Sequence, residues 1–406
     1  MQVEGARTVS LSRAVSAVAV LCLLIWPAAS LAQNVKTGGE ETLTIKGFII
    51  ASLFAQNQDF VFGNGQSAEF PAGSEFTTDE WFLDGDVRNT RLTMVFNGPE
   101  IEDHFKLGGV LELDFFGGFN GAGAFSDEQQ TPRLRLAYID VIKGKTTYRL
   151  GQAWTPLFGN VPASPTHVAF PLAYGSAGLV GWRFPGLYIY RNLSDADDKV
   201  AKKLTFALFS GSWSGPGNNL NSGSAGEAST TPQIEIRGDF SGKTGSGGTW
   251  GVYLVGHYDK KDLSGANATA PNDDLDGTAL EFGAKYAKGA FSLQGNAYQG
   301  TAIGQQFGQI TQFGDISSWG AWIQGGYKFN KNWSGHLLYG VDDPDDADVL
   351  AAGASRVENE MIAASTQYKI GPYVFGLEWL HDTLSSGASS TETEGDQISA
   401  SFWYKF

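Results

Sequence analysis

The sequence is poor in cysteine and, beyond its first 32 residues, in long hydrophobic runs. Its single cysteine, Cys22, lies inside an N-terminal segment with the features of an export signal. No disulfide, thiolate nucleophile or cysteine metal site is therefore expected in the mature chain. No later segment offers about 18 consecutive apolar residues, so any later membrane span must be built from strands that close into a barrel.

The export signal has three parts. Arg7 and Arg13 give a basic start, residues 14–26 an apolar stretch, and Ser30-Leu31-Ala32 a cleavage site of small residues. The sequence therefore predicts a signal peptide over 1–32, a short periplasmic segment over 33–42, and a single domain over 43–406.

Charge is scarce and mostly negative. Only 17% of the residues are charged, and the formal net charge is −15, which makes nucleic acid a poor partner. The 53 glycines, 13% aromatic residues and mean hydropathy of −0.17 describe a chain in which polar and apolar residues interleave. No metal or other cofactor is expected, because the five histidines are scattered singly and no zinc-site spacing occurs.

Runs of roughly ten residues with period-two character divide the chain, and they are separated alternately by very short turns and by long polar stretches. Sixteen such runs are predicted as strands: 43–54, 87–97, 104–116, 132–142, 146–154, 180–191, 203–213, 232–240, 249–259, 277–287, 290–299, 318–329, 333–342, 358–370, 372–382 and 396–406. The alternation alone would also fit a soluble sandwich. The alternating connections favour an all-β, transmembrane antiparallel β-barrel of about 16 strands, with 14 or 18 as alternatives.

The last run shows the alternation most clearly. Phe402, Tyr404 and Phe406 fall on one face with other apolar residues, and polar residues fall mostly on the other. Trp403 is the exception. The apolar face is expected to meet lipid, so Phe406 ends a lipid-facing stripe.

Arginine is unevenly distributed: seven of the eleven arginines fall between Arg88 and Arg191. Alternation places several of them inside the barrel, because their neighbours Leu92, Leu134 and Leu150 face lipid, where a charge costs roughly 2–4 kcal/mol near the midplane. The same pattern turns two carboxylates inward beside them. The predicted basic wall is Arg91, Arg133, Arg135, Arg149 and Arg183, and the predicted acidic partners are Glu112 and Asp114.

Two roles remain open for these charges. Paired charges could simply brace the wall. Alternatively, an excess of arginine would leave a positive field that favours anion passage. The two roles are compatible.

A long connection over 155–179 contains no Asp or Glu but several prolines and large apolar residues. An exposed loop would be more polar, so this loop is expected to fold into the lumen. The residues predicted to form the constriction are Trp154, Pro156, Phe158, His167 and Phe170.

Enzymatic motifs are weak. Residues 211–215 resemble a nucleophile elbow, but Trp213 stands where serine is required. The acidic runs 273–276 and 342–348 do not match a calcium-binding loop and are interpreted as solvated loops. An outer-membrane enzyme and a plugged structural or adhesive barrel stay as the alternatives to a channel.

Four segments give the chain a resemblance to trimeric Gram-negative porins, and more closely to the DcaP-like porins associated with dicarboxylate and aromatic-acid uptake. They are RNTRL at 88–92, LELDFFG at 111–117, RLRLAY at 133–138 and LGQAWT at 150–155. The resemblance implies that Arg91, Arg133, Arg135 and Arg149 form the basic side of the constriction, with Glu112 and Asp114 as inward partners and 155–179 as the constriction loop. The sequence departs from many porins because this loop has no acidic residues.

The resemblance also implies a location and partners. The expected location is the bacterial outer membrane, in contact with lipid and lipopolysaccharide. The expected cargo is small anionic or neutral hydrophilic solutes, and the expected assembly is a homotrimer. Phe402, Tyr404 and Phe406 resemble the C-terminal signature that the barrel-assembly machinery recognises.

Overall fold

The computed structural model describes residues 33–36, 41–61, 70–71, 81–117, 130–210, 229–262, 274–308, 310 and 314–406. The predicted signal peptide and the elbow-like segment 211–215 lie outside these residues. The strands are β1 Gln33–Lys36, β2 Thr42–Gln56, β3 Phe82–Asp86, β4 Arg91–Ile101, β5 Phe105–Asp114, β6 Arg133–Lys143, β7 Thr146–Trp154, β8 Arg183–Asn192, β9 Val200–Phe209, β10 Gln233–Lys243, β11 Thr249–Asp262, β12 Asp274–Lys288, β13 Phe291–Thr301, β14 Ser317–Lys328, β15 Trp333–Pro344, β16 Arg356–Ile370, β17 Tyr373–Ser386 and β18 Thr391–Lys405.

Helical structure is sparse. The described residues include two short 3-10 turns, η2 Glu102–His104 and η3 Gly304–Gln306, and one helix, α3 Asp346–Ala351. None of the helices in the described part of the chain is long and apolar enough to cross a membrane.

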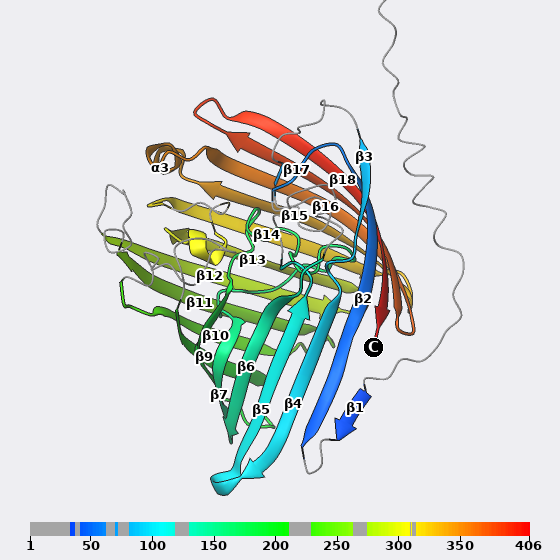
Figure 1. Cartoon of the computed structure of the whole chain (residues 1–406), viewed down its shortest axis with the longest axis vertical. Coiled ribbons are helices and arrows are strands. Elements are labelled where there is room, and N and C mark those ends of the chain that lie inside the picture. Colours follow the sequence, from blue (N-terminus) through cyan, green and yellow to red (C-terminus); the bar gives the residue numbers. More distant parts are fainter. Residues whose placement is uncertain are drawn as a thin grey trace, which may run out of the picture.

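The strands form one closed antiparallel barrel (Figure 1). Each strand from β4 to β17 pairs with the next along the chain, and β18 returns to pair with β2. Because β3 and β4 pair with successive parts of β2, they occupy one position in the wall. The wall therefore has 16 positions, which confirms the predicted fold class and strand count. The short strand β1 pairs with the start of β2, beyond the end of β18.

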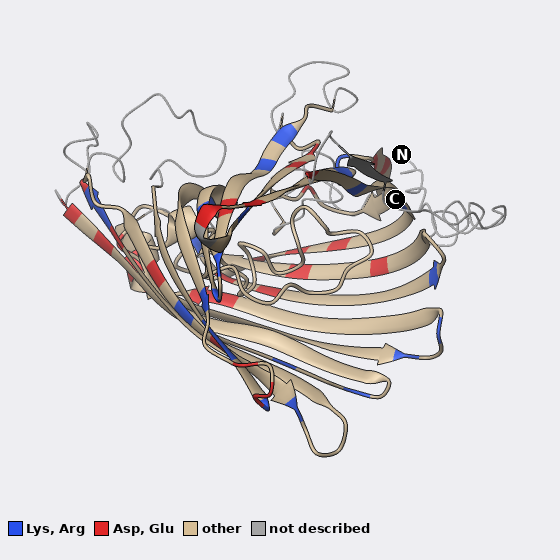
Figure 2. Cartoon of the chain, turned by 90° about the horizontal axis from the view of Figure 1, so that it is seen from below, with Lys and Arg blue, Asp and Glu red and all other residues tan. Residues whose placement is uncertain are grey.

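Short turns join the strands at one end of the barrel and longer connections join them at the other. The turns between β6 and β7, between β12 and β13, and between β16 and β17 contain Gly144, Gly289 and Gly371, each with a positive φ of 55–60°. Two-residue hairpins favour this conformation, and glycine adopts it without strain. Several ends of this kind carry lysine or arginine (Figure 2).

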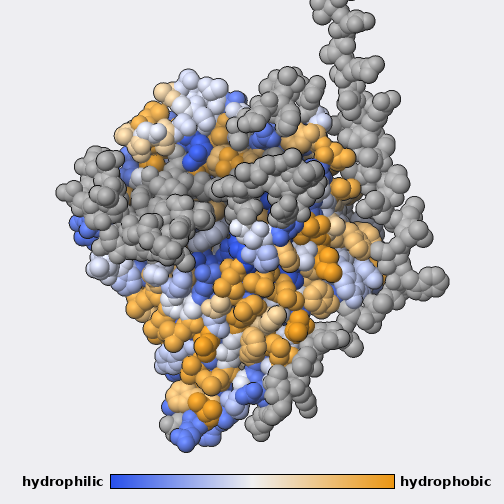
Figure 3. Space-filling model, in the orientation of Figure 1, coloured by the Kyte–Doolittle hydropathy of each residue, from blue (hydrophilic) through white to orange (hydrophobic). Residues whose placement is uncertain are grey.

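The alternation predicted from the sequence places apolar side chains on the outer face of the wall and the buried residues, many of them polar, on its inner face. Leu254 and Leu280 are 51% and 56% exposed on the outer face, whereas the neighbouring Val255 and Glu281 are fully buried on the inner face. The outer surface of the strands nearest the viewer is accordingly rich in hydrophobic residues (Figure 3). An apolar outer band with a polar interior is the pattern of a barrel that spans lipid.

Two predictions about the ends of strands need correction. The strand predicted over 87–97 is interrupted, because the Asp86 carboxylate accepts the N–H of Arg88 at 2.6 Å and Thr90 N–H donates to Val87 C=O at 3.0 Å. Arg88 therefore lies in this break and not in a strand.

The acidic run 342–348 is not a solvated loop throughout. Asp342 is fully buried on β15 and accepts a hydrogen bond from Tyr298, while Asp345 caps α3 by accepting the N–H of Asp348 at 3.0 Å. Alternation continues two residues further than predicted, and a carboxylate at the helix N-cap stabilises the following turn.

Candidate functional site

The connection between β7 and β8, residues 155–182, lies inside the barrel and is called the constriction loop below. Its backbone is held by side chains from widely separated parts of the wall. Leu157 N–H donates to Glu235 at 2.7 Å, and Ala163 N–H donates to Gln324 at 2.7 Å. Trp403 donates its indole N–H to Pro165 C=O at 2.7 Å. The inward fold predicted for this loop is confirmed, and the inward Trp403 explains the exception to the alternation.

Two glycines allow the loop to touch the wall. A Cβ on Gly376 of β17 would lie 2.1 Å from Pro165 Cβ, and a Cβ on Gly178 would lie 2.4 Å from the backbone N of Ala321. Gly178 also has a φ of +92°. Any larger side chain at these positions would push the loop away from the wall.

The second half of the loop is a hydrophobic core inside the lumen. Phe170 and Tyr174 are buried with wall residues such as Trp322. At the start of the loop, Trp154 stacks on Phe158 with 3.7 Å between ring centroids. This packing explains why a loop in a polar lumen is rich in apolar residues, and it places the predicted residues Trp154, Phe158 and Phe170 together.

Histidine side chains add two attachments of the loop, one at the predicted residue His167 and one at His257, which the sequence did not single out. His167 Nδ1 lies 2.6 Å from Glu378, which also accepts the hydroxyl of Ser164 at 2.9 Å. On the opposite wall, His257 lies between Glu235 at 2.9 Å and Asp259 at 2.8 Å.

The second histidine belongs to a chain of contacts across two loops. Lys261 contacts Asp259 and donates to Ala302 C=O at 2.9 Å, so the network reaches the connection after β13. The positions 257, 259 and 261 share one face of β11 by period-two spacing, and this was the signal available in the sequence.

The arginine cluster on β4 to β6 is composed of Arg91, Arg133 and Arg135 with Glu112 and Asp114. It contacts the constriction loop, because Arg91 donates to Val168 C=O at 3.3 Å. Arg133 and Arg135 each place a guanidinium nitrogen 2.7 Å from Asp114 Oδ2. Arg135 Nε lies 2.9 Å from Glu112, and Arg91 Nε lies 3.8 Å from the same carboxylate. The structure thus brings five of the predicted site residues into one group.

Arg149 and Arg183 lie outside this cluster. Arg149 forms a bidentate pair with Asp140, at 2.8 and 2.9 Å, and its guanidinium lies 3.6 Å from the centroid of Tyr138. Asp140 was not predicted, although it lies directly opposite Arg149 in the β6–β7 register.

Arg183 is 6% exposed and lies between two tryptophan rings, 4.8 Å from Trp154 and 4.7 Å from Trp182. No carboxylate in the described part of the chain is within ion-pair distance of it. Pro156, also predicted, accepts a hydrogen bond from Arg237 of β10 at 2.8 Å.

The C-terminal aromatic residues lie on the outer face. Phe402 and Tyr404 contact the ring of Tyr373 on β17, with centroid distances of 5.9 and 5.4 Å. The backbone of Phe406 exchanges two hydrogen bonds with Gly47 of β2. The end of the chain therefore takes part in closing the barrel.

Solved structures of other proteins contain a similar barrel. No family model matches the chain, and no curated protein matches it in sequence. Among solved structures, the outer-membrane channel DcaP of Acinetobacter baumannii is similar over 93% of this chain and 100% of its own, with a TM-score of 0.67 and 17% identity. An anion-selective porin from Comamonas acidovorans matches 90% of this chain and 100% of its own, with a TM-score of 0.57 and 14% identity. OmpF of Salmonella typhi, in a complex with daunomycin, covers 92% and 100%, with a TM-score of 0.60 and 13% identity. The chain therefore has the fold of the outer-membrane porins.

Proposed function

We propose that the protein is a passive channel of the bacterial outer membrane that conducts small hydrophilic solutes, favours anions such as carboxylates, and catalyses no reaction. One observation carries the proposal: the constriction loop lies inside a closed barrel with a largely polar inner face and contacts the arginine cluster there, where Arg91 donates to Val168 C=O at 3.3 Å. A loop folded into a polar lumen narrows a diffusion path, and basic side chains in the narrow part favour anions.

The charge balance supports anion preference. Four guanidiniums, Arg91, Arg133, Arg135 and Arg149, face three carboxylates, Glu112, Asp114 and Asp140, which leaves an excess of one positive charge. Arg183 adds another. Bracing and selectivity are compatible here, because the ion pairs fix the guanidiniums and the local excess of charge is positive.

The proposed location and partners follow from the two faces of the wall. The apolar outer band suits lipid, and residues 1–32 would direct export. We propose that lipopolysaccharide surrounds the outer end and that the assembly machinery recognises Phe402, Tyr404 and Phe406. A homotrimer is proposed because one structural neighbour, OmpT of Vibrio cholerae, is described in a trimer form.

The alternatives fit the residues less well. A hydrolytic barrel would need an accessible histidine beside a nucleophile near one rim. His167 and His257 are buried against Glu378 and Glu235 at the constriction loop, and the exposed His104 contacts Glu100. A plugged barrel would have all its inward arginines paired, and Arg183 lacks a carboxylate within ion-pair distance in the described residues. Conductance of the purified barrel in planar lipid bilayers tests the proposal: discrete ohmic steps are expected, and a silent barrel would refute it.

A further inference from the structure

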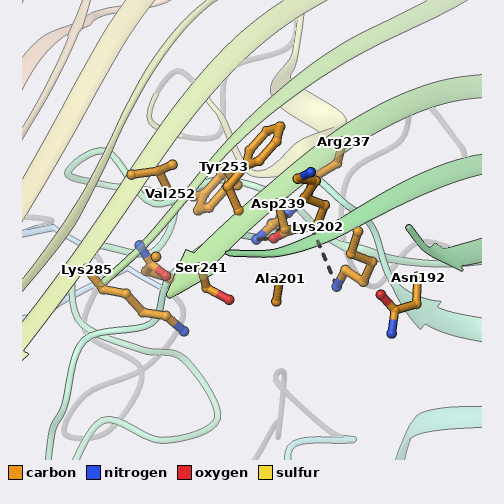
Figure 4. A pocket seen from close by; sticks show the side chains of 13 residues that line it. Asn192, Ala201, Lys202, Arg237, Asp239, Ser241, Val252, Tyr253 and Lys285 are labelled. Carbon is orange, nitrogen blue, oxygen red and sulfur yellow. Dashed lines mark hydrogen bonds and ion pairs between the residues drawn. The ribbon is translucent and has the colours of Figure 1, made fainter. Parts of the chain in front are cut away.

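Two adjoining cavities open on the inner wall towards the end of the barrel that carries the short turns. The first has a volume of about 380 Å³ and the second about 1160 Å³, and both are lined by Ala201, Ser241 and Lys285. The second reaches the turn between β10 and β11 at Thr244. We call the first cavity the lysine pocket (Figure 4).

The lysine pocket carries an excess of positive charge. On the inner face it is lined by Lys203, Arg237 and Lys285, together with one carboxylate, Asp239, while Lys202 of the adjoining outward-facing row also belongs to the lining. That carboxylate is shared, because Arg237 donates to it at 2.9 and 3.0 Å and Lys203 Nζ lies 3.5 Å away. Lys285 forms no ion pair in the part of the chain that the structure describes. On the inner face, three cations against one anion leave an excess of two positive charges.

The strand register creates the hollow. Lys203, Asp239, Tyr253 and Gly283 form one row across β9 to β12, and Ala201, Ser241, Gly251 and Lys285 form the next row on the same face. A Cβ on Gly251 would lie 3.0 Å from Lys285 Cε, so the lysine side chain lies across the space that this glycine leaves.

The pocket adjoins the constriction. Asn160 of the constriction loop is part of its lining, and Arg237 also donates to Pro156 C=O. Beyond it, the second cavity adds Lys199 and Lys243, with Asp198 as a carboxylate. A solute that leaves the constriction on this side therefore enters a region of net positive charge before it reaches the mouth.

We propose that the lysine pocket is a separate anion-binding station, between the constriction and the periplasmic mouth, that takes small oxyanions with phosphate or carboxylate groups. This inference rests on the proposed channel function. Ammonium and guanidinium groups donate charge-assisted hydrogen bonds to oxyanions, and the cavity is large enough for an anion of a few heavy atoms. Unlike the arginine cluster, the pocket has two cationic charges that no carboxylate balances.

The test is single-channel conductance in planar bilayers as a function of anion concentration, first with inorganic phosphate and then with succinate. A binding station makes the conductance saturate. We expect the double variant Lys203→Gln/Lys285→Gln to raise the half-saturating concentration by about two- to fivefold for each lysine removed, the scale of one exposed charge near the ion. Lys288→Gln is the matched control, since Lys288 lies on the outer face of the same strand as Lys285, and it should leave the concentration unchanged.

The outcomes separate the two proposals. A shift with phosphate alone assigns the station to phosphate, and a shift with both anions assigns it to oxyanions generally. If the double variant conducts like Lys288→Gln, the station is wrong while the channel stands. If the wild-type barrel does not conduct, the channel itself is wrong, and the station with it. The variant Lys285→Arg keeps the positive charge and should saturate at the wild-type concentration. That result would show that loss of charge, and not misfolding, causes the shift in the double variant.

Discussion

The attachment of the constriction loop at Glu378 gives the sharpest structural prediction. Glu378→Ala removes from the wall strand β17 the acceptor of Ser164 and His167, two residues of the constriction loop. Leaving a buried donor without a partner costs about 1–3 kcal/mol, so the two together cost about 2–6 kcal/mol. Because 1.4 kcal/mol is tenfold, this shifts the local equilibrium towards a detached loop segment by at least an order of magnitude.

Only the contacts at Ser164 and His167 should be lost, because Ala163 keeps its bond to Gln324 and Pro165 keeps its bond to Trp403. Leu157 keeps its bond to Glu235, and Ala169 keeps its bond to Asn89 at 2.6 Å. We therefore expect a folded barrel with a wider path. The assay is liposome swelling with sugars of increasing size: Glu378→Ala should admit larger sugars and swell faster than wild type.

The control for this prediction is Glu360→Ala. Glu360 is an exposed glutamate on the neighbouring strand β16 and accepts a hydrogen bond from Tyr339 at 2.5 Å, so its loss leaves the loop untouched. If Glu378→Ala and Glu360→Ala both kept the wild-type size limit, the loop would not set the width of the path, and the reasoning would be refuted.

Two further predictions concern packing and charge. Gly376→Ala should lower the thermal unfolding midpoint, because its Cβ would collide with Pro165 and overpacking costs about 1–3 kcal/mol. The control Gly256→Ala has open space around the new Cβ and should keep the wild-type midpoint. Equal midpoints for the two variants would contradict the close contact at Gly376. Asp114→Asn removes the buried carboxyl charge between Arg133 and Arg135. It should shift the reversal potential in the direction of greater anion preference and lower the free energy of unfolding by about 3–5 kcal/mol. An unchanged reversal potential would show that the cluster does not influence permeation.

The strands were predictable because lipid on one side and water on the other impose a period of two on every span. This local rule placed Arg91, Arg133 and Arg135 on the inner face with Glu112 and Asp114, and the structure groups all five. The rule also made Trp403 look anomalous. Its reason is a contact with Pro165, which is 238 positions away in the chain and cannot be found from local pattern.

The features missed by the sequence depend on register between strands. Asp140 becomes the partner of Arg149 only when β6 and β7 are aligned, and the lysine pocket needs β9 to β12 in register. The break before Arg91 was missed for a similar reason, since Asn89 turns inward there to hold the constriction loop. Such partners are set by tertiary structure, and alternation within one strand specifies only the face.

The central claim is an anion-favouring channel, and the reversal potential across a planar bilayer with a potassium chloride gradient tests it most directly. The reversal potential of the wild-type channel should be displaced from zero towards the equilibrium potential of chloride. In the triple variant Arg91→Gln/Arg135→Gln/Arg149→Gln, the guanidiniums of Arg133 and Arg183 would remain with the carboxylates of Glu112, Asp114 and Asp140. The balance would change from an excess of two positive charges to an excess of one negative charge. The reversal potential of the triple variant should therefore be displaced towards the equilibrium potential of potassium. A wild-type channel that prefers potassium, or a triple variant with an unchanged potential, would contradict the account.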